Sequence, residues 1–356
     1  MKYNDNQSIS KNDEIDTMPV SFLPYPDPPA EAAFYGLAGE IVRTIEPNSE
    51  ADPMALLIQF HIAFGNALGR TAYAKAEADK HFTNEFATLV GETAKGRKGT
   101  SWGYIRNLFE QIDHDWTNNR VQSGLSSGEG MAWQVRDPIV KTEPIREKKQ
   151  ITGYQQVTVD EGINDKRLLV YESEFAGALR VMQRDGNTLS AKVRDAWDGR
   201  KLNSMTKNDQ ATATDAHISI VGHITREELQ RYMDRTELAN GLANRFLWIA
   251  TKRSKALPNG GEEVNFSPFR NRLKQIIERA KTCGEIVRDE AAQGIWNGVY
   301  ENLSNGQPGM LGAATGRAEA HVMRLSVLYA LENGSNLVKA EHLLAALALV
   351  SRCVEK

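Results

Sequence analysis

The middle of the sequence alternates short apolar runs with stretches of helical periodicity. The runs are FATLV (86–90), RLLVYESEF (167–175), HISIVGHIT (217–225) and FLWIAT (246–251). Apolar runs of this length that end in glycine or polar residues are typical of buried strands. Helical stretches around residues 176–185 and 226–233 separate them. This alternation predicts an α/β fold with a mostly parallel sheet flanked by helices.

Helical patterns precede and follow this region. Apolar residues recur at helical spacing from Phe34 to Ile45, and a second helical run begins after Asp52 and Pro53. A turn-rich break covers residues 254–268, and residues 269–356 are expected to be all-helical. We therefore expect a flexible lead-in (1–30), an N-terminal helical layer (31–80), an α/β core (81–256) and a helical C-terminal part (257–356).

Composition excludes several classes of protein. The formal net charge of the 356 residues is -3, which argues against histone-like binding of nucleic acid but allows a local basic groove. Cys283 and Cys353 are far apart and predict neither a metal site nor a disulfide framework, which favours a reducing cytosol. The polar N-terminus and the lack of an apolar run of ~18 residues predict a soluble, cytoplasmic protein without a membrane partner.

The segment GETAKGRKGTSW (91–102) lies between the first apolar run and a helical stretch. A phosphate-binding loop of the form GxxxxGK[ST] occupies this position in nucleotide-binding folds. Gly91 and Gly96 have the correct separation, but Arg97 stands in the lysine position and Lys98 in the hydroxyl position. The motif is therefore shifted by one residue, and Lys98 is the candidate phosphate lysine.

In the shifted motif Gly99 stands where the hydroxyl belongs, so Thr100 or Ser101 would reach a metal ion. The alternative is a glycine- and lysine-rich surface turn that caps a helix, and spacing alone does not decide between the two. The position between strand and helix favours phosphate binding. The candidate cofactor-binding residues of this segment are Gly91, Thr93, Lys95, Gly96, Arg97, Lys98, Gly99, Thr100 and Ser101, and Thr100 is the candidate metal ligand among them.

Two carboxylates follow the second apolar run. Glu172 and Glu174 stand just beyond RLLVY, and the alternation of a strand would place both on one face. One carboxylate would orient Mg²⁺ and the other would polarise an attacking water. We name both as catalytic candidates and Glu172 as a metal ligand. The alternative is a pair of solvated carboxylates at a strand end.

Polar side chains also border the third and fourth runs. His223 and Thr225 end the third run, where ligands of open α/β sheets bind, although a lone histidine there is more often structural. Thr225 is also predicted to cap the following helix, with Glu228 completing a capping box. Arg245 directly precedes the fourth run and could act as an arginine finger across a subunit interface or form a salt bridge within the chain.

Two arginines of the C-terminal part share a helix face. Arg317 and Arg324 are two helical turns apart, with His321 between them. This arrangement could reach back to a nucleotide, and a solvated stripe explains the spacing equally well.

Three segments carry a resemblance to a known family. They are YESEFAGALRVMQRDGNTLSAKVRDAWDGRKLNSMTKN, AHISIVGHITREEL and NGLANRFLWIATKRSKALPNGG. Together they resemble a P-loop NTPase domain family of originally unknown function from prophages, plasmids and integrated elements, whose members often follow a primase-polymerase module. The resemblance covers roughly residues 86–348. It implies a RecA/AAA+-like ATPase core that uses ATP and Mg²⁺.

The resemblance also implies roles for individual residues. Lys98 would be the Walker A lysine and Glu172 or Glu174 the Walker B acid. Thr225 would occupy a sensor position and Arg245 would be the finger. Arg317 and Arg324 would belong to a helical lid within residues 257–356.

The function expected from these features is an ATP-hydrolysing motor of a mobile-element replication protein of the helicase or primase type. We expect a homo-oligomer, for which a hexameric ring is one form, acting on single-stranded DNA. The alternative is a non-hydrolysing nucleotide- or DNA-binding scaffold in replication initiation or element-borne defence. A small-molecule kinase is disfavoured because no acceptor-site motif is evident. The basic residues expected along the DNA are Lys207, Arg226, Lys252, Arg253 and Lys255.

Overall fold

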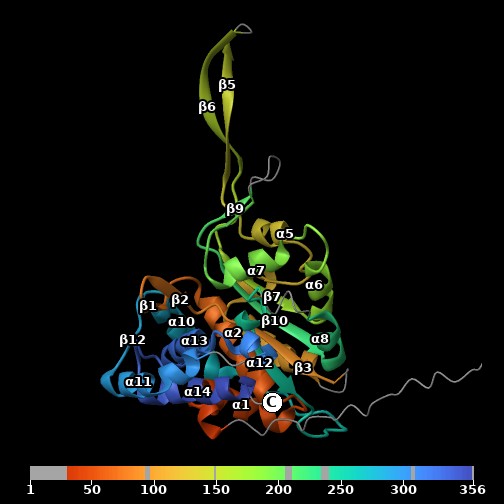
Figure 1. The fold of residues 1–356 in the computed structure, drawn as a ribbon, viewed down its shortest axis with the longest axis vertical. Coiled ribbons are helices and arrows are strands. Elements are labelled where there is room, and N and C mark those ends of the chain that lie inside the picture. Colours follow the sequence, from red (N-terminus) through yellow and green to blue (C-terminus); the bar gives the residue numbers. More distant parts are fainter. Residues whose placement is uncertain are drawn as a thin grey trace, which may run out of the picture.

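The computed structural model describes residues 30–92, 97–147, 150–204, 211–233, 240–305 and 309–354. A five-stranded parallel sheet forms the centre, in the order β11-β3-β10-β7-β4 (Figure 1). The prediction of a mostly parallel sheet flanked by helices is confirmed, and each of the four apolar runs supplies one strand. The strands are β3 (Phe86–Gly91), β4 (Val121–Gln122), β7 (Arg167–Glu172), β10 (His217–Thr225) and β11 (Leu247–Thr251).

Alternate residues of the strands enter two separate hydrophobic cores. In β7, Leu169 belongs to one core, whereas Leu168 and Val170 belong to the other. In β3, Ala87 belongs to the first of these cores and Phe86 to the second. Because successive strand residues point to opposite faces, this division shows that the sheet is covered on both sides.

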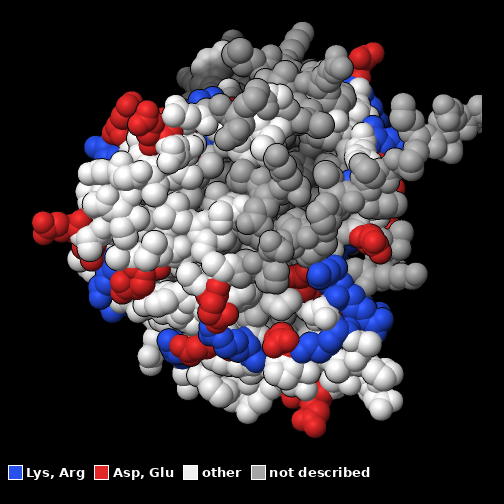
Figure 2. All heavy atoms as spheres, turned by 60° about the horizontal axis from the view of Figure 1, so that its bottom comes forward, with Lys and Arg blue, Asp and Glu red and all other residues white. Residues whose placement is uncertain are grey.

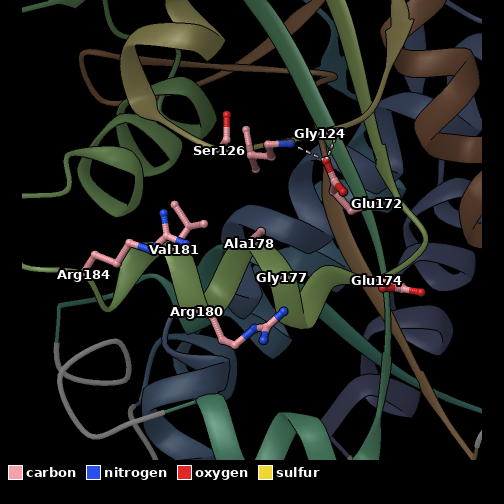
Figure 3. A pocket seen from close by; sticks show the side chains of 10 residues that line it. Gly124, Ser126, Glu172, Glu174, Gly177, Ala178, Arg180, Val181 and Arg184 are labelled. Carbon is pink, nitrogen blue, oxygen red and sulfur yellow. Dashed lines mark hydrogen bonds between the residues drawn. The ribbon is translucent and has the colours of Figure 1, made fainter.

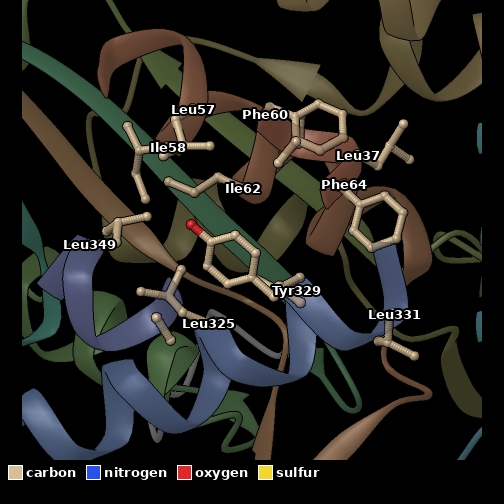
Figure 4. Packing of buried hydrophobic residues seen from close by; sticks show 14 of the residues in the cluster. Leu37, Leu57, Ile58, Phe60, Ile62, Phe64, Leu325, Tyr329, Leu331 and Leu349 are labelled. Atoms are coloured by element: carbon tan, nitrogen blue, oxygen red, sulfur yellow. The ribbon is translucent and has the colours of Figure 1, made fainter. Parts of the chain in front are cut away.

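Helices of both chain ends build the core on one face. The buried residues of α2, α10, α13 and α14 form a single cluster. Tyr329 of α13 lies inside it and points toward Ile62 of α2, as Figure 4 shows. Its hydroxyl donates a hydrogen bond to the Ala33 carbonyl. The N-terminal helical layer and the C-terminal helical part, which were expected as separate parts, therefore share one core.

The helices that contribute residues to this core are η1 (Glu31–Phe34), α1 (Gly36–Ile45), α2 (Pro53–Leu68), α3 (Lys98–Glu110), α4 (His114–Asn119), α10 (Ser267–Ala280), α11 (Glu290–Ser304), α13 (Ala318–Glu332) and α14 (Ala340–Val354). The short η2 (Glu46–Asn48) follows α1 and has no buried residue. The remaining described helices are α5 (Gly128–Trp133), α6 (Phe175–Met182), α7 (Leu189–Trp197), α8 (Arg226–Tyr232), η4 (Ala243–Arg245) and α12 (Gly309–Thr315).

Four small two-stranded sheets surround this body. They pair β1 (Tyr73–Ala76) with β2 (Asp79–Phe82), β5 (Ile139–Glu147) with β6 (Gln150–Asp160), β8 (Leu202–Asn203) with β9 (Thr212–Ala213), and β12 (Val287–Arg288) with β13 (Leu337–Val338). The last pair corrects the expectation that residues 269–356 are all-helical.

The β5–β6 hairpin is an arm that projects from one end of the molecule (Figure 1). It consists of two long antiparallel strands. Most of its side chains are exposed, including Tyr154 at 68% and Ile151 at 52%. None of its residues enters either hydrophobic core.

In the described part of the chain, no helix combines the length and apolar character that a membrane crossing requires.

Candidate functional site

The ends of three strands bring the predicted loop, the acids and the polar third run to one edge of the sheet. Gly91 of β3 pairs with Thr225 of β10 and with Thr251 of β11, and Gly222 of β10 pairs with Glu172 of β7. All these strands are parallel, so their carboxyl ends meet there, as expected for the ligand edge of an open α/β sheet. We call this region the carboxyl edge.

Lys98, the first residue of α3, lies at the carboxyl edge. Its ammonium donates to the carbonyls of Gly91, Glu92 and Ile224 at 3.3, 3.1 and 3.0 Å. No ion pair of this ammonium forms within the described residues. Burial lowers the pKa of Lys98, and the charges of Glu228 and Glu227 oppose that change. Within the described residues, Lys98 is thus a half-buried cation whose hydrogen-bond partners are backbone carbonyls.

Close packing explains why the loop begins with a glycine. A Cβ atom on Gly91 would lie 2.8 Å from the Thr251 carbonyl oxygen and 3.5 Å from the Lys98 ammonium. Any larger residue would separate β3 from β11 or displace the lysine. Gly99 has open space around it and is exposed, so it does not have this constraint.

Arg97 is directed elsewhere than predicted. It lies at the N-cap of α3 with φ 51°, in the left-handed region, and its side chain pairs with Glu50 at 2.6 Å. Arg253 pairs with the same carboxylate. The Leu257 backbone N–H, Arg253 and Arg97 lower the pKa of Glu50 to about 2. The Nε atom of Arg97 thus donates to Glu50, and binding of phosphate by Arg97 would require its guanidinium to exchange this partner.

The two candidate hydroxyls differ in availability. Ser101 is fully buried, accepts a hydrogen bond from Gln59 at 2.6 Å and donates to the Lys98 carbonyl at 2.6 Å. Its hydroxyl is fully used in tying α3 to α2, so Ser101 does not fit the predicted role at a cofactor. Thr100 is exposed in the first turn of α3 and is the hydroxyl that fits. The predicted residues Thr93, Lys95 and Gly96 lie outside the described residues.

The predicted acids do not act as a pair. β7 ends at Glu172, and Glu174 is the N-cap residue of α6. Strand alternation therefore does not extend to Glu174, and the prediction that both share a face is wrong. In Figure 3, Glu172 points toward Gly124 while Glu174 points away from it. The Oε1 atom of Glu172 accepts from the backbone N–H groups of Gly124 and Leu125, both at 2.6 Å.

A pocket of about 570 Å³ lies next to Glu172, on the side of the sheet order away from Lys98 (Figure 3). Small residues of α6 and of the loop after β4 form much of its wall. A smaller pocket of about 170 Å³ adjoins the same loop. The residues that line the larger pocket are Gly124, Leu125, Ser126, Glu172, Glu174, Gly177, Ala178, Arg180, Val181 and Arg184.

Thr225 forms the predicted capping box. Its side chain accepts from the Glu228 backbone N–H at 3.2 Å, and the Glu228 carboxylate accepts from the Thr225 backbone N–H at 3.1 Å. The capping prediction is confirmed. The hydroxyl also donates to Glu228 at 3.0 Å, so a sensing role for Thr225 would require it to exchange this bond.

Two aromatic rings that we did not predict, Trp102 and Tyr171, lie with His223 at the carboxyl edge. Trp102 of α3 stacks on Tyr171 of β7 at 4.9 Å, and Tyr171 meets the His223 ring edge-on at 5.1 Å. Burial and the charge of Lys98 lower the pKa of His223 to about 3, so the imidazole is neutral at pH 7. Trp102, directly after the loop, was the available signal in the sequence.

The opposite end of the sheet holds the predicted arginines. Arg324 donates to the carbonyls of Asn84 and Trp197 at 2.7 and 2.9 Å. Asn84 precedes β3, whose other end carries Gly91, roughly 20 Å away at ~3.3 Å per residue. Arg324 thus lies at what we call the amino edge. Its predicted contact with a nucleotide at Lys98 is wrong.

Arg245 and Arg317 lie at the amino edge as well. Arg245 is buried and donates to Asp198 at 2.9 Å and to the Gly241 carbonyl at 2.7 Å. Arg317 faces the same carboxylate at 3.5 Å, and its guanidinium lies 5.0 Å from the Trp197 ring centre. Of the two alternatives for Arg245, the structure favours a salt bridge within the chain over an arginine finger. Arg317 lies at the amino edge, so it is too far from Lys98 to contact a nucleotide bound there, and the prediction of such a contact is wrong.

The basic residues expected along DNA do not form a free row. Arg253 pairs with Glu50, and Lys255 pairs with Glu46 at 2.6 Å. Figure 2 shows lysine and arginine side chains interspersed with acidic ones over that face. Lys207 lies outside the described residues. The described part of this face carries mixed charge.

The carboxyl edge could bind a metal ion that is carried by a nucleotide, but not one held alone by those protein ligands that the structure describes. Among the described residues, no group of three His, Cys, Asp or Glu side chains could hold a metal ion. Mg²⁺ bound to a nucleotide needs only one or two protein ligands, because phosphates and water supply the rest. Glu172 and Thr100 fit that requirement, and a protein-only metal cage does not.

Comparisons with known proteins leave the family open. No protein-family model matches the chain, and no curated protein matches it.

Proposed function

We propose that the carboxyl edge binds the triphosphate of ATP and that the protein is an ATPase. The observation that carries this proposal is Lys98, a half-buried ammonium at the mouth of α3 whose partners within the described residues are backbone carbonyls. A desolvated cation gains much from an oxyanion that replaces weaker dipolar partners. The N-terminus of α3 would add its backbone N–H groups and its dipole.

The order of the strands leaves space for a nucleotide and its metal ion. β10 lies between β3, which leads into Lys98, and β7, which ends in Glu172. The Lys98 ammonium reaches the Ile224 carbonyl of β10, and Glu172 pairs with Gly222, two residues earlier on that strand. A triphosphate with Mg²⁺ would fit across the end of β10, between the lysine and the carboxylate. Thr100 and the free oxygen of Glu172 would supply protein ligands to Mg²⁺.

The wider role in this proposal rests on the family resemblance. A RecA/AAA+-like ATPase of a mobile element would act as an oligomeric motor on single-stranded DNA during replication. Arg226, the first residue of α8, directly follows Thr225 of the carboxyl edge and is therefore a candidate for contact with DNA. The arginine finger of such a motor would have to be a residue other than Arg245.

One observation favours the alternative of a non-hydrolysing scaffold. Glu172 already accepts two short backbone hydrogen bonds, and Glu174 points away from it. An enzyme that activates water needs an acceptor free to receive a proton or orient the nucleophile. A scaffold would bind nucleotide at Lys98 without needing that group.

Measurements of nucleotide binding and of phosphate release distinguish an ATPase from a non-hydrolysing scaffold. Wild-type protein is titrated with a fluorescent ATP analogue, and phosphate release is followed with and without single-stranded DNA. Lys98→Ala should weaken binding at least tenfold and abolish release. Glu172→Gln should retain binding and lose release if the protein is an ATPase.

Lys274→Ala, in an exposed position of α10, is the matched control and should behave as wild type. Binding without release in the wild type, with or without DNA, would favour the scaffold. Equal nucleotide affinity of Lys98→Ala and wild type would refute both proposals.

A further inference from the structure

A second arginine-lined cavity lies outside the central sheet. Arg288 of β12 places its guanidinium 4.0 Å from the ring centre of Trp296, on α11. Its Nε atom is buried and has no hydrogen-bond partner within the described residues. Burial lowers the pKa of Arg288, with no acid opposing the change. The cation thus lies against the indole, and its buried Nε atom lacks an acceptor within the described residues.

Three arginines that are more deeply buried than Arg288 contrast with it in the bonds of their guanidinium groups, although the Nε atoms of Arg245 and Arg324 also lack a partner within the described residues. Arg245 bonds to Asp198, Arg324 to two carbonyls, and Arg120 to the carbonyls of Arg167 and Gln134. A buried N–H group without an acceptor costs free energy comparable to a lost hydrogen bond. An acceptor from outside the chain would remove that cost.

A cavity of about 220 Å³ is lined by Arg288. Lys75 of β1 and Gln293 of α11 contribute further donors, and the buried Ser326 of α13 lines it as well. Glu285 is the acid among the lining residues and is exposed, so water screens its charge. Donors and cations therefore dominate the wall.

We propose that this cavity binds a small molecule through a phosphate or carboxylate group, with Arg288 as the main donor. A guanidinium presents paired N–H groups that match the two oxygens of such an anion. The cavity is smaller than the ~300–1,000 Å³ that is typical of pockets for drug-sized ligands, which limits the ligand to a small metabolite. Lys75 would add charge at the entrance.

This site is independent of the proposed nucleotide site. Its walls come from β1, β12, β13, α11 and α13, none of which is a strand of the central sheet. Inorganic phosphate could also bind at Lys98, so the experiment uses the full chain carrying Lys98→Ala. Failure of one proposal then leaves the other untouched.

The Lys98→Ala protein is titrated separately with inorganic phosphate and with acetate, by calorimetry and by tryptophan fluorescence. We expect saturable binding of at least one anion, and which one binds distinguishes a phosphate from a carboxylate ligand. Adding Arg288→Gln should weaken it about tenfold or more, because hydrogen bonds to a charged group are lost. Arg288→Lys keeps the positive charge but lacks the paired N–H groups of a guanidinium, so its anion affinity should lie between those of Arg288 and Arg288→Gln. Trp296→Phe should remove most of the fluorescence change.

Arg279→Gln, an exposed arginine of α10, is the matched control and should leave binding unchanged. Lys75→Ala, also exposed, tests the site even if Arg288→Gln does not fold, and should weaken binding severalfold. The proposal is overturned if neither anion binds at tens of millimolar, or if binding is unchanged by both Arg288→Lys and Lys75→Ala.

Discussion

The two edges of the central sheet hold buried cations in opposite ways. At the amino edge, Arg324 and Arg245 are matched by carbonyls and by Asp198. At the carboxyl edge, Lys98 has backbone carbonyls as its acceptors within the described residues. Burying a charge is costly unless it is paired. The difference indicates that the amino edge is built for stability and that the carboxyl edge leaves room for an anion from outside.

The largest expected effect is on stability at the amino edge. Arg324→Met removes a fully buried guanidinium that bonds to two carbonyls and lies 4.0 Å from Glu85. We expect a loss of about 3–5 kcal/mol in the free energy of unfolding, because the two buried carbonyls lose their donor and Glu85 is left with His321. Denaturant unfolding measures it. Arg279→Met, exposed on α10, should change stability by less than ~0.5 kcal/mol.

A loss for Arg324→Met below about 1 kcal/mol would break the comparison, since the amino edge would then not depend on its paired charges. The nucleotide affinity of this variant, measured where it is still folded, should equal that of wild type.

A smaller loss of stability is expected for Arg245, the other buried arginine of the amino edge. Arg245→Met leaves Asp198 facing Arg317 at 3.5 Å and Arg200 at 3.7 Å, so the carboxylate keeps two cations. We expect a loss of about 1.5–3 kcal/mol, the usual range for hydrogen bonds to a charged group. The sharper readout is ATPase activity per folded molecule. Unchanged stability with abolished activity would restore the arginine finger and contradict a purely structural role for Arg245.

At the carboxyl edge, we expect removal of the cation to affect function strongly and stability only weakly. Lys98→Met removes a desolvated cation that forms no ion pair in the described part of the chain, so stability should change by less than about 1 kcal/mol or increase. Function should be lost in the same variant. Thermal unfolding with and without ATP measures both, because ATP should raise the Tm of wild type and leave that of Lys98→Met unchanged. A loss of several kcal/mol without ligand would place Lys98 among the structural cations.

Much of the sheet could be predicted from the sequence, for a physical reason. The run 86–90 is almost wholly apolar, and the run 217–225 has apolar residues at both odd and even positions, Ile218, Ile220, Val221 and Ile224. Burial on both faces of the sheet favours that pattern. The β5–β6 arm escaped prediction because strands without a core need no apolar periodicity. The common core of both chain ends also escaped it, since the pattern of α13 or α14 shows that a face is buried and not what covers it.

The site could be predicted only in part. Lys98, Gly91 and Thr225 were identified because strand ends and helix starts are local features. The arginines were misplaced because spacing along α13 shows which residues share a face but not which end of the sheet that face meets. Arg324 contacts Asn84, which is 240 positions away in the sequence. Ser101 was misassigned for a similar reason, since its partner Gln59 belongs to another helix.

The smallest expected effect concerns the ion pairs beside the carboxyl edge. Leu257, Arg253 and Arg97 lower the pKa of Glu50 from 4.5 in the unfolded chain to about 2. A lowered carboxyl pKa contributes stability that is present above the unfolded value and is lost as the pH falls toward the folded value. The Tm difference between wild type and Glu50→Gln should therefore be constant above pH 4.5 and shrink toward pH 2. Arg97→Gln should reduce this difference in part and leave ATP affinity unchanged. If Arg97→Gln instead weakens ATP binding as strongly as Lys98→Ala, the guanidinium exchanges Glu50 for phosphate, and the carboxyl edge holds two cations for its ligand rather than one.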